Sequence, residues 1–136
     1  MALPTLPRFV LNEREVELGS PDGPAGGLSV LDFVRRHRRL TGTKEGCKEG
    51  DCGACTVLIG ELHDDGDSVR YAPVTSCMMP VAELGGKHLV TIEGLDLGRC
   101  NTAQRRIVEH GASQCGFCTP GIAVSLTGRL MDGPPP

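Results

Sequence analysis

The segment KEGCKEGDCGACTV, residues 44–57, constrains the fold of this chain more than any other stretch. It places Cys47, Cys52 and Cys55 within nine positions and intersperses them with three glycines. A disulfide uses two thiols and a catalytic nucleophile uses one, whereas three clustered thiols indicate metal ligands, usually completed by a fourth. Because so many glycines disfavour a regular helix or strand, the segment is predicted to be a loop wrapped around a metal site.

The cysteine content of the whole chain supports a metal site. There are seven cysteines among 136 residues, and an odd number leaves one thiol over in any disulfide framework. Clustered cysteines of a reducing compartment bind metal more often than they form disulfides. The N-terminus lacks the ordered regions of a signal peptide, and no segment approaches the roughly 18 apolar residues of a membrane span. A net charge of −3 without a long basic run disfavours a nucleic-acid partner, so we expect a cytoplasmic metalloprotein.

The spacing of the first thiol set selects the kind of metal. Cys47, Cys52 and Cys55 form C-x4-C-x2-C, and Cys77 follows at the end of a predicted strand. This is the spacing of plant-type [2Fe–2S] ferredoxins, in which four thiolates hold two irons and two sulfides. The spacing therefore predicts one [2Fe–2S] cluster held by these four cysteines.

The glycines of the loop suit such a cluster for two reasons. Gly46, Gly50 and Gly53 permit unusual φ values and a close approach of the backbone to the inorganic core. Backbone N–H groups that point at the sulfurs stabilise the negative charge of the cluster, and larger side chains would block that approach.

Two other kinds of metal site fit the cysteine spacing less well. Structural zinc sites pair two C-x2-C knuckles about 15–20 residues apart, whereas Cys52/Cys55 and Cys115/Cys118 lie much further from each other. A Rieske site requires histidines in place of two cysteines, and neither cysteine set has them in the required pattern. Both alternatives are less favoured than the ferredoxin-type cluster.

Hydrophobic patterning divides the chain at about residue 94. Before it, strands are expected within 8–18 around a turn at Asn12-Glu13, over 56–62, over 69–77 and around Val90 and Ile92. Residues 20–27 and 63–68 are predicted loops, and Ser29 to Leu40 a helix that covers one face of the sheet. These elements describe a small α+β domain.

The remainder, residues 95–136, shows two helical patterns joined by a loop. Thr119 is the predicted N-cap of the second helix, with Pro120 at its first position. The apolar faces are expected from Ile107 with Val108, and from Ile122, Val124, Leu126 and Leu130. Two helices alone bury little surface, so this unit looks unfinished at the final DGPPP.

A second thiol pair lies where the loop meets the second helix. Cys115 and Cys118 in SQCGFCTPG occupy a helix N-terminus, a favourable environment for thiolates. The pair is half of a four-ligand site. A redox dithiol is the alternative, but no βαβ pattern surrounds it. The seventh cysteine, Cys100, is expected to be a plain buried or surface thiol.

The stretches TGTKEGCKEGDCGACTV, SCMMPVAELGGKHLVTIEGL and QCGFCTPG together resemble the iron–sulfur region of the xanthine dehydrogenase family of molybdenum hydroxylases. The resemblance implies a ferredoxin-like (β-grasp) domain over 1–94, followed by the first half of a helical [2Fe–2S]-binding domain, part of a four-helix bundle, over 95–136. It implies that Cys115 and Cys118 are two ligands of a second cluster, completed by a downstream C-x-C motif that this sequence does not reach. Gln114 resembles the family residue near the molybdenum cofactor.

The resemblance also implies a function. The chain would relay electrons from a molybdopterin-binding large subunit to FAD and NAD⁺ during purine oxidation, as part of a hetero-oligomer. It would contain no catalytic residues of its own. Three alternatives stay open at this point: an iron–sulfur subunit of an aldehyde- or carbon monoxide-oxidising relative, a free-standing [2Fe–2S] ferredoxin, and a structural metal domain.

Overall fold

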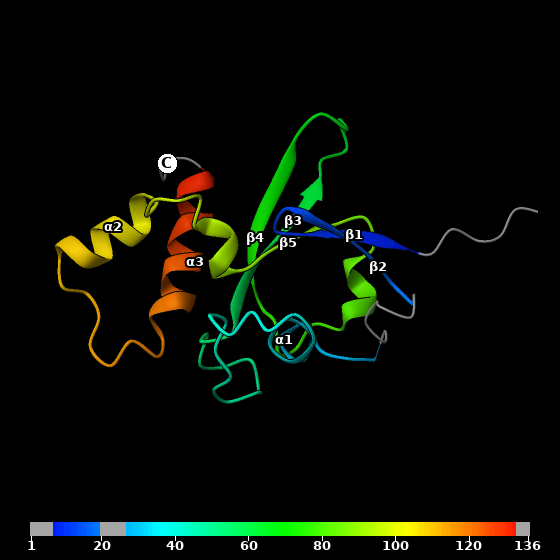
Figure 1. The fold of residues 1–136 in the computed structure, drawn as a ribbon. Coiled ribbons are helices and arrows are strands. Elements are labelled where there is room, and N and C mark those ends of the chain that lie inside the picture. The colour runs from blue at the N-terminus through cyan, green and yellow to red at the C-terminus, as the bar shows by residue number, and fades with distance from the viewer. Residues whose placement is uncertain (1–6, 20–26, 133–136) are drawn as a thin grey trace, which may run out of the picture.

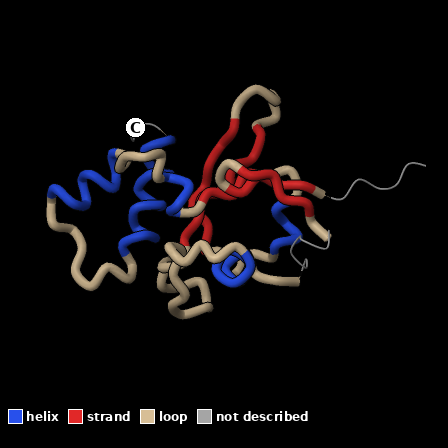
Figure 2. Tube along the Cα trace, in the orientation of Figure 1, coloured by secondary structure: helices blue, strands red, loops and turns tan. Residues whose placement is uncertain are grey.

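The computed structural model describes residues 7–19 and 27–132, and a five-stranded sheet with helices on both faces organises them (Figures 1 and 2). The strands are β1 (Arg8–Leu11), β2 (Arg14–Glu17), β3 (Thr56–Leu62), β4 (Val69–Thr75) and β5 (His88–Val90), in the order β2-β1-β5-β3-β4. β1 and β5 run parallel, and all other neighbours run antiparallel. The expected α+β class is confirmed.

Both expected hairpins are present. β1 and β2 turn at Asn12, which has a φ of 53° and whose side chain bonds both the N–H and the hydroxyl of buried Thr91. β3 and β4 are joined by a turn in which the Asp65 carboxylate accepts the N–H groups of Asp67 and Ser68. Of the predicted loop at 20–27, residues 20–26 lie outside the described residues.

The predicted helix from Ser29 to Leu40 is shorter and less regular than expected. Ser29 caps it as predicted, but α1 (Val30–Asp32) continues into a π-helical stretch, η1 (Phe33–His37), and ends there. The wider turn lets the N–H of Leu40 bond the carbonyl of Val34 after a reversal at Arg39, where φ is 55°. Its buried side, Leu31, Phe33 and Val34, follows the prediction.

The prediction of a strand around Val90 and Ile92 is correct only for its first half. β5 ends at Val90, and Ile92 begins a 3₁₀ turn, η3 (Ile92–Leu95). The reason is the bond from the N–H of Thr91 to the Asn12 side chain, which takes the place of a ladder bond at that position. A second 3₁₀ turn, η2 (Val81–Leu84), packs with α1 over the main core, which includes Phe9, Val57 and Leu89.

The other face of the sheet is covered by a helix that sequence patterning assigned to a separate unit. α3 (Thr119–Met131) lies against β3 and β4, and α2 (Thr102–Glu109) lies beyond it (Figure 1). Val124 of α3 packs with Leu58 and Val90 in a second core. A Cβ on Gly128 would come within 2.8 Å of Cδ2 of Leu58, so the helix approaches the sheet closely. The helix predicted after Ser29 does cover one face of the sheet, but the prediction left out the cover that α3 provides on the other face.

The expected apolar faces of α2 and α3 are only partly buried. Ile107 and Val124 are buried, as predicted. The following apolar side chains are exposed instead: Val108, Ile122, Leu126, Leu130 and Met131. α3 faces the sheet with small residues, since Gly121, Ala123 and Gly128 are the others that it buries.

The start of α3 lies one residue earlier than predicted. Cys118, not Thr119, is the N-cap, and Pro120 stands at the second helical position. The hydroxyl of Thr119 pairs with that of Ser113, at 2.7 Å, and so ties the thiol loop to the helix. None of the helices within 7–19 and 27–132 is long and apolar enough to cross a bilayer.

The cap of α2 allows a direct test of this part of the fold. The Asn101 side chain accepts the N–H of Gln104, which bonds back to Asn101, and its amide donates to Thr127 of α3. Asn101→Ala is expected to lower the free energy of unfolding by about 1 kcal/mol, measured by urea denaturation. Asn101→Asp keeps the capping oxygen but removes the amide N–H that donates to Thr127. It is expected to cost less stability than Asn101→Ala and to measure the bond to Thr127 alone. A cost for Asn101→Ala no larger than for Asn101→Asp would contradict the capping role.

Candidate metal centre

The cysteine loop is closed at its base and shaped by residues in the left-handed region. The N–H of Lys44 donates to the carbonyl of Ala54 at 3.2 Å, so residues 44–54 form a closed loop. Gly50 and Gly53 have φ values of 82° and 71°, as their role in the loop predicted. Lys48, with a φ of 58°, also adopts this conformation, although it is not a glycine.

Gly46 serves the loop by close approach instead of by an unusual φ. A Cβ at this position would lie 2.7 Å from Sγ of Cys52, closer than real Cβ contacts. Any larger residue would displace the Cys52 thiol, because the backbone at Gly46 lies directly beside that sulfur.

Backbone N–H groups point at the first two sulfurs. Sγ of Cys47 accepts the N–H of Glu49 at 3.3 Å and that of Cys52 at 3.4 Å. Sγ of Cys52 accepts the N–H of Cys47 at 3.4 Å. The two bonds to Sγ of Cys47, above all the one from the Cys52 N–H, lower the pKa of Cys47 to about 7, because they stabilise its thiolate. The loop is thus built to hold negative charge on sulfur.

The other two thiols of the first set form a second pair. Cys55 is buried, and its thiol neighbours that of Cys77, which is half-buried. Burial first, and then the neighbouring Cys55, raise the pKa of Cys77, while the N–H of Gly50 opposes them. Ser76 holds the two segments together, since its N–H and hydroxyl both donate to the Cys55 carbonyl, at 3.3 and 2.7 Å.

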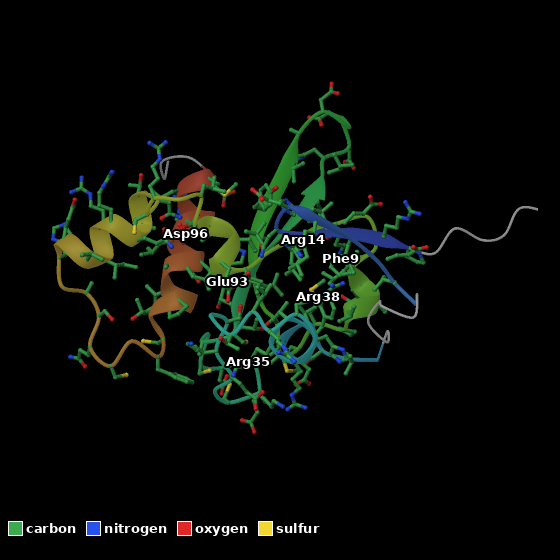
Figure 3. The ribbon with its side chains drawn as sticks, in the orientation of Figure 1. Phe9, Arg14, Arg35, Arg38, Glu93 and Asp96 are labelled. Atoms are coloured by element: carbon green, nitrogen blue, oxygen red, sulfur yellow. The ribbon has the colours of Figure 1, made fainter. Side chains whose placement is uncertain are left out.

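The loop is anchored from two sides by residues that sequence patterning overlooked. Arg35 of η1 donates to the carbonyls of Thr41 and Thr43, at 3.2 and 2.7 Å. Glu93 of η3 accepts the N–H of Gly42 at 2.7 Å. Figure 3 shows both side chains. The arginine-rich side of a helix ordinarily faces solvent, but Arg35 instead fastens the segment that enters the cysteine loop.

The arrangement fits a binuclear cluster. The structure pairs Cys47 with Cys52 and Cys55 with Cys77, and a [2Fe–2S] cluster takes two thiolates on each iron. The inward N–H groups match the anionic charge of such a cluster. Within 7–19 and 27–132, no group of three or more His, Cys, Asp or Glu side chains is placed around a single metal ion.

The second thiol set lies on the loop between α2 and α3. Cys115 and Cys118 are exposed there, with Gly116 between them at a φ of 85°. Gln114 is exposed on the same loop. Cys100 is exposed before the N-terminus of α2, whereas Cys115 follows its C-terminus, so a helix about 12 Å long separates them along the chain.

Comparison with known proteins assigns both halves of the chain. Residues 15–82 match the 2Fe-2S iron-sulfur cluster binding domain, and residues 91–136 match a second [2Fe-2S] binding domain. Xanthine dehydrogenase from Blastobotrys adeninivorans is 47% identical over 91% of this chain and 9% of its own length. Aldehyde oxidase 1 from Rattus norvegicus is 40% identical over 80% of this chain and 8% of its own length.

Solved structures agree. Quinoline 2-oxidoreductase from Pseudomonas putida 86 superposes with a TM-score of 0.73 at 34% identity, covering 97% of this chain and 75% of that one. Aldehyde oxidoreductase from Desulfovibrio gigas gives a TM-score of 0.75 at 32% identity, covering 93% of this chain and 13% of that one. The chain thus spans about a tenth of the curated relatives it matches. It belongs, as the iron–sulfur region with two [2Fe–2S]-binding domains, to the xanthine dehydrogenase family of molybdenum hydroxylases.

Proposed function

We propose that this chain is the electron-transfer module of a xanthine dehydrogenase-like enzyme. Electrons taken from a purine at a molybdopterin site would reach FAD and NAD⁺ by way of this module. A [2Fe–2S] cluster supplies one-electron chemistry when bound. The observation that supports the proposal is the arrangement of the four cysteines as two thiol pairs, one of them under backbone N–H donors, because a binuclear cluster takes two thiolates on each iron.

The site assignment is part of this proposal. Cys47, Cys52, Cys55 and Cys77 would hold the first cluster, in a ferredoxin-like domain over 1–94. In the helical domain over 95–136, Cys115 and Cys118 would supply two ligands of the second cluster. Gln114, exposed beside Cys115, would face the molybdenum cofactor.

The partners follow from the function. A molybdopterin-binding large subunit and an FAD domain or subunit would complete a cytoplasmic hetero-oligomer. The first thiol loop is well placed for electron exit, because Cys52 and the neighbouring Lys48, Glu49 and Asp51 are exposed. We propose that this surface faces the flavin.

A second candidate substrate class is supported by the comparisons. Aldehyde oxidases are among the relatives, at 36–40% identity, against 47% for one xanthine dehydrogenase. The module is the same in either case, since the substrate would bind elsewhere in the enzyme. A free-standing ferredoxin is less favoured, because the second [2Fe-2S] binding domain matches residues 91–136 and α3 packs on the sheet.

Iron content tests the proposed module. With four cysteines committed to the first cluster, Cys100, Cys115 and Cys118 remain, and a cluster held by cysteine alone needs four. Residues 1–136, expressed alone and reconstituted with iron and sulfide, are expected to hold about two irons per chain. They should show visible absorbance and an electron paramagnetic resonance (EPR) signal on reduction.

Each outcome separates the alternatives. A colourless, EPR-silent chain that takes up zinc would contradict the electron-transfer function. Four irons in two stable clusters would show that a non-cysteine ligand or a second copy completes the second site. In the whole enzyme, reduction of the EPR-visible centres by xanthine would support a purine substrate. Their reduction by an aldehyde but not by xanthine would support an aldehyde substrate.

A further inference from the structure

The two thiol loops of this chain are in contact, although about 60 residues separate them in the sequence. A Cβ on Gly121, in the first turn of α3, would clash with the carbonyl oxygen of Gly53 and lie 3.3 Å from Cα of Ala54. The backbone of α3 therefore rests on the first thiol loop between Cys52 and Cys55. Figure 1 shows the start of α3 beside the loop that precedes β3.

One side chain of the second loop extends this contact to a sulfur of the first. Phe117 stands between Cys115 and Cys118, and a Cβ on Gly46 would lie 3.6 Å from its Cε1. The same Cβ would lie 2.7 Å from Sγ of Cys52. The ring edge and the sulfur thus flank one backbone position, Gly46.

The exposed fraction of Phe117 shows that part of this residue is covered by the protein. The residue is 48% exposed, so about half of its surface is covered by the rest of the protein. A half-exposed aromatic side chain contributes to stability only through the part of its apolar surface that is buried against other groups. The first thiol loop contributes to that cover, because the ring edge lies beside Gly46.

We infer that Phe117 is a positioning residue that couples the two thiol sites, by shielding the Gly46 side of the otherwise exposed Cys52 and by fixing the distance between the two loops. This inference rests on the proposed function, since it concerns the environment of a cluster held by the first four cysteines. It makes one side chain of the second site a determinant of the first site's potential.

The sign of the effect follows from charge. Reduction adds negative charge to a cluster that is already anionic, and water stabilises that charge better than an aromatic ring does. Truncation of Phe117 opens the Gly46 side of Cys52 to water as well. The reduction potential of the first cluster should therefore rise, and its iron should become more accessible to chelators.

The test uses the whole enzyme that contains this chain. Phe117→Ala is compared with the wild type, with the conservative Phe117→Leu, and with Leu130→Ala, which truncates a 58% exposed apolar side chain at the far end of α3. An EPR-monitored redox titration gives the midpoint potential of the cluster, and the release of iron to a chelator gives its accessibility.

We expect a positive shift of the midpoint potential and faster iron release in Phe117→Ala, a smaller shift in Phe117→Leu, and wild-type behaviour in Leu130→Ala. If Phe117→Ala loses the cluster altogether, the sign of the shift in Phe117→Leu decides. Potentials and release rates of both Phe117 variants equal to those of Leu130→Ala would overturn the inference. Absence of a [2Fe–2S] signal in the wild type would instead overturn the proposed function.

Discussion

Replacing Cys52 with serine is expected to abolish the [2Fe–2S] signal of residues 1–136 and to reduce the bound iron from about two per chain to nearly none. Cys52 is the thiol that the loop is most closely built around. Its sulfur accepts the N–H of Cys47, its own N–H donates to Sγ of Cys47, and Gly46 leaves room for it. A serine hydroxyl is a shorter and harder ligand, so one iron loses half of its protein ligands.

The loss should extend to the fold of the loop. Binding energy at a metal site formed only in the folded chain contributes to folding, so residues 44–54 should become protease-sensitive in Cys52→Ser. Cys100→Ser is the matched control, because Cys100 is an exposed cysteine outside both thiol sets. It is expected to keep the wild-type EPR spectrum and iron content. An unchanged spectrum in Cys52→Ser, or an equal loss in Cys100→Ser, would contradict the assignment of the first site.

The sequence predicted the first thiol loop well because its chemistry is local. Thiol spacing within nine positions limits the metal, and the unusual φ values at Gly50 and Gly53 follow from the need to wrap a compact core. The hairpins were predictable for the same reason, since alternation and turn residues act over a few neighbours.

The anchors of the loop were not predictable in this way. Arg35, Ser76 and Glu93 act on backbone groups of other segments, and each looks like an ordinary surface or strand residue in isolation. Their roles depend on which segments the fold brings together. A single sequence carries no local signal for that, because the bonds join side chains to main-chain atoms of any residue type.

The position of α3 was missed for a different reason. Hydrophobic patterning looks for large apolar side chains, and these predicted a face through Ile122, Val124, Leu126 and Leu130, of which only Val124 is buried. The helix instead meets the sheet with small residues such as Gly121 and Gly128. Small residues let the helix backbone approach the sheet closely and cover β3. They contribute little to a hydrophobic pattern, so the pattern does not reveal this contact.

The two buried glycines of α3 make this explanation testable. Gly121→Ala would bring a Cβ against backbone atoms of Gly53 and Ala54, which cannot rotate away. Helix propensity favours alanine by about 0.5–1 kcal/mol, but overpacking typically costs about 1–3 kcal/mol. At Gly128 the nearest atom is the end of the Leu58 side chain, which can change rotamer.

Gly121→Ala is therefore expected to lower the free energy of unfolding of the reconstituted chain by about 1–3 kcal/mol and to loosen the first thiol loop. Gly128→Ala, the matched control on the same helix, should lie within about 1 kcal/mol of the wild type, because the gain in helix propensity offsets the shift of Leu58. Urea denaturation measures both, and iron release to a chelator reports on the loop. Equal stabilities for the two variants would mean that α3 does not rest on the Gly53 carbonyl. A loss at Gly128 larger than at Gly121 would place the tightest contact over β3 instead of over the cysteines.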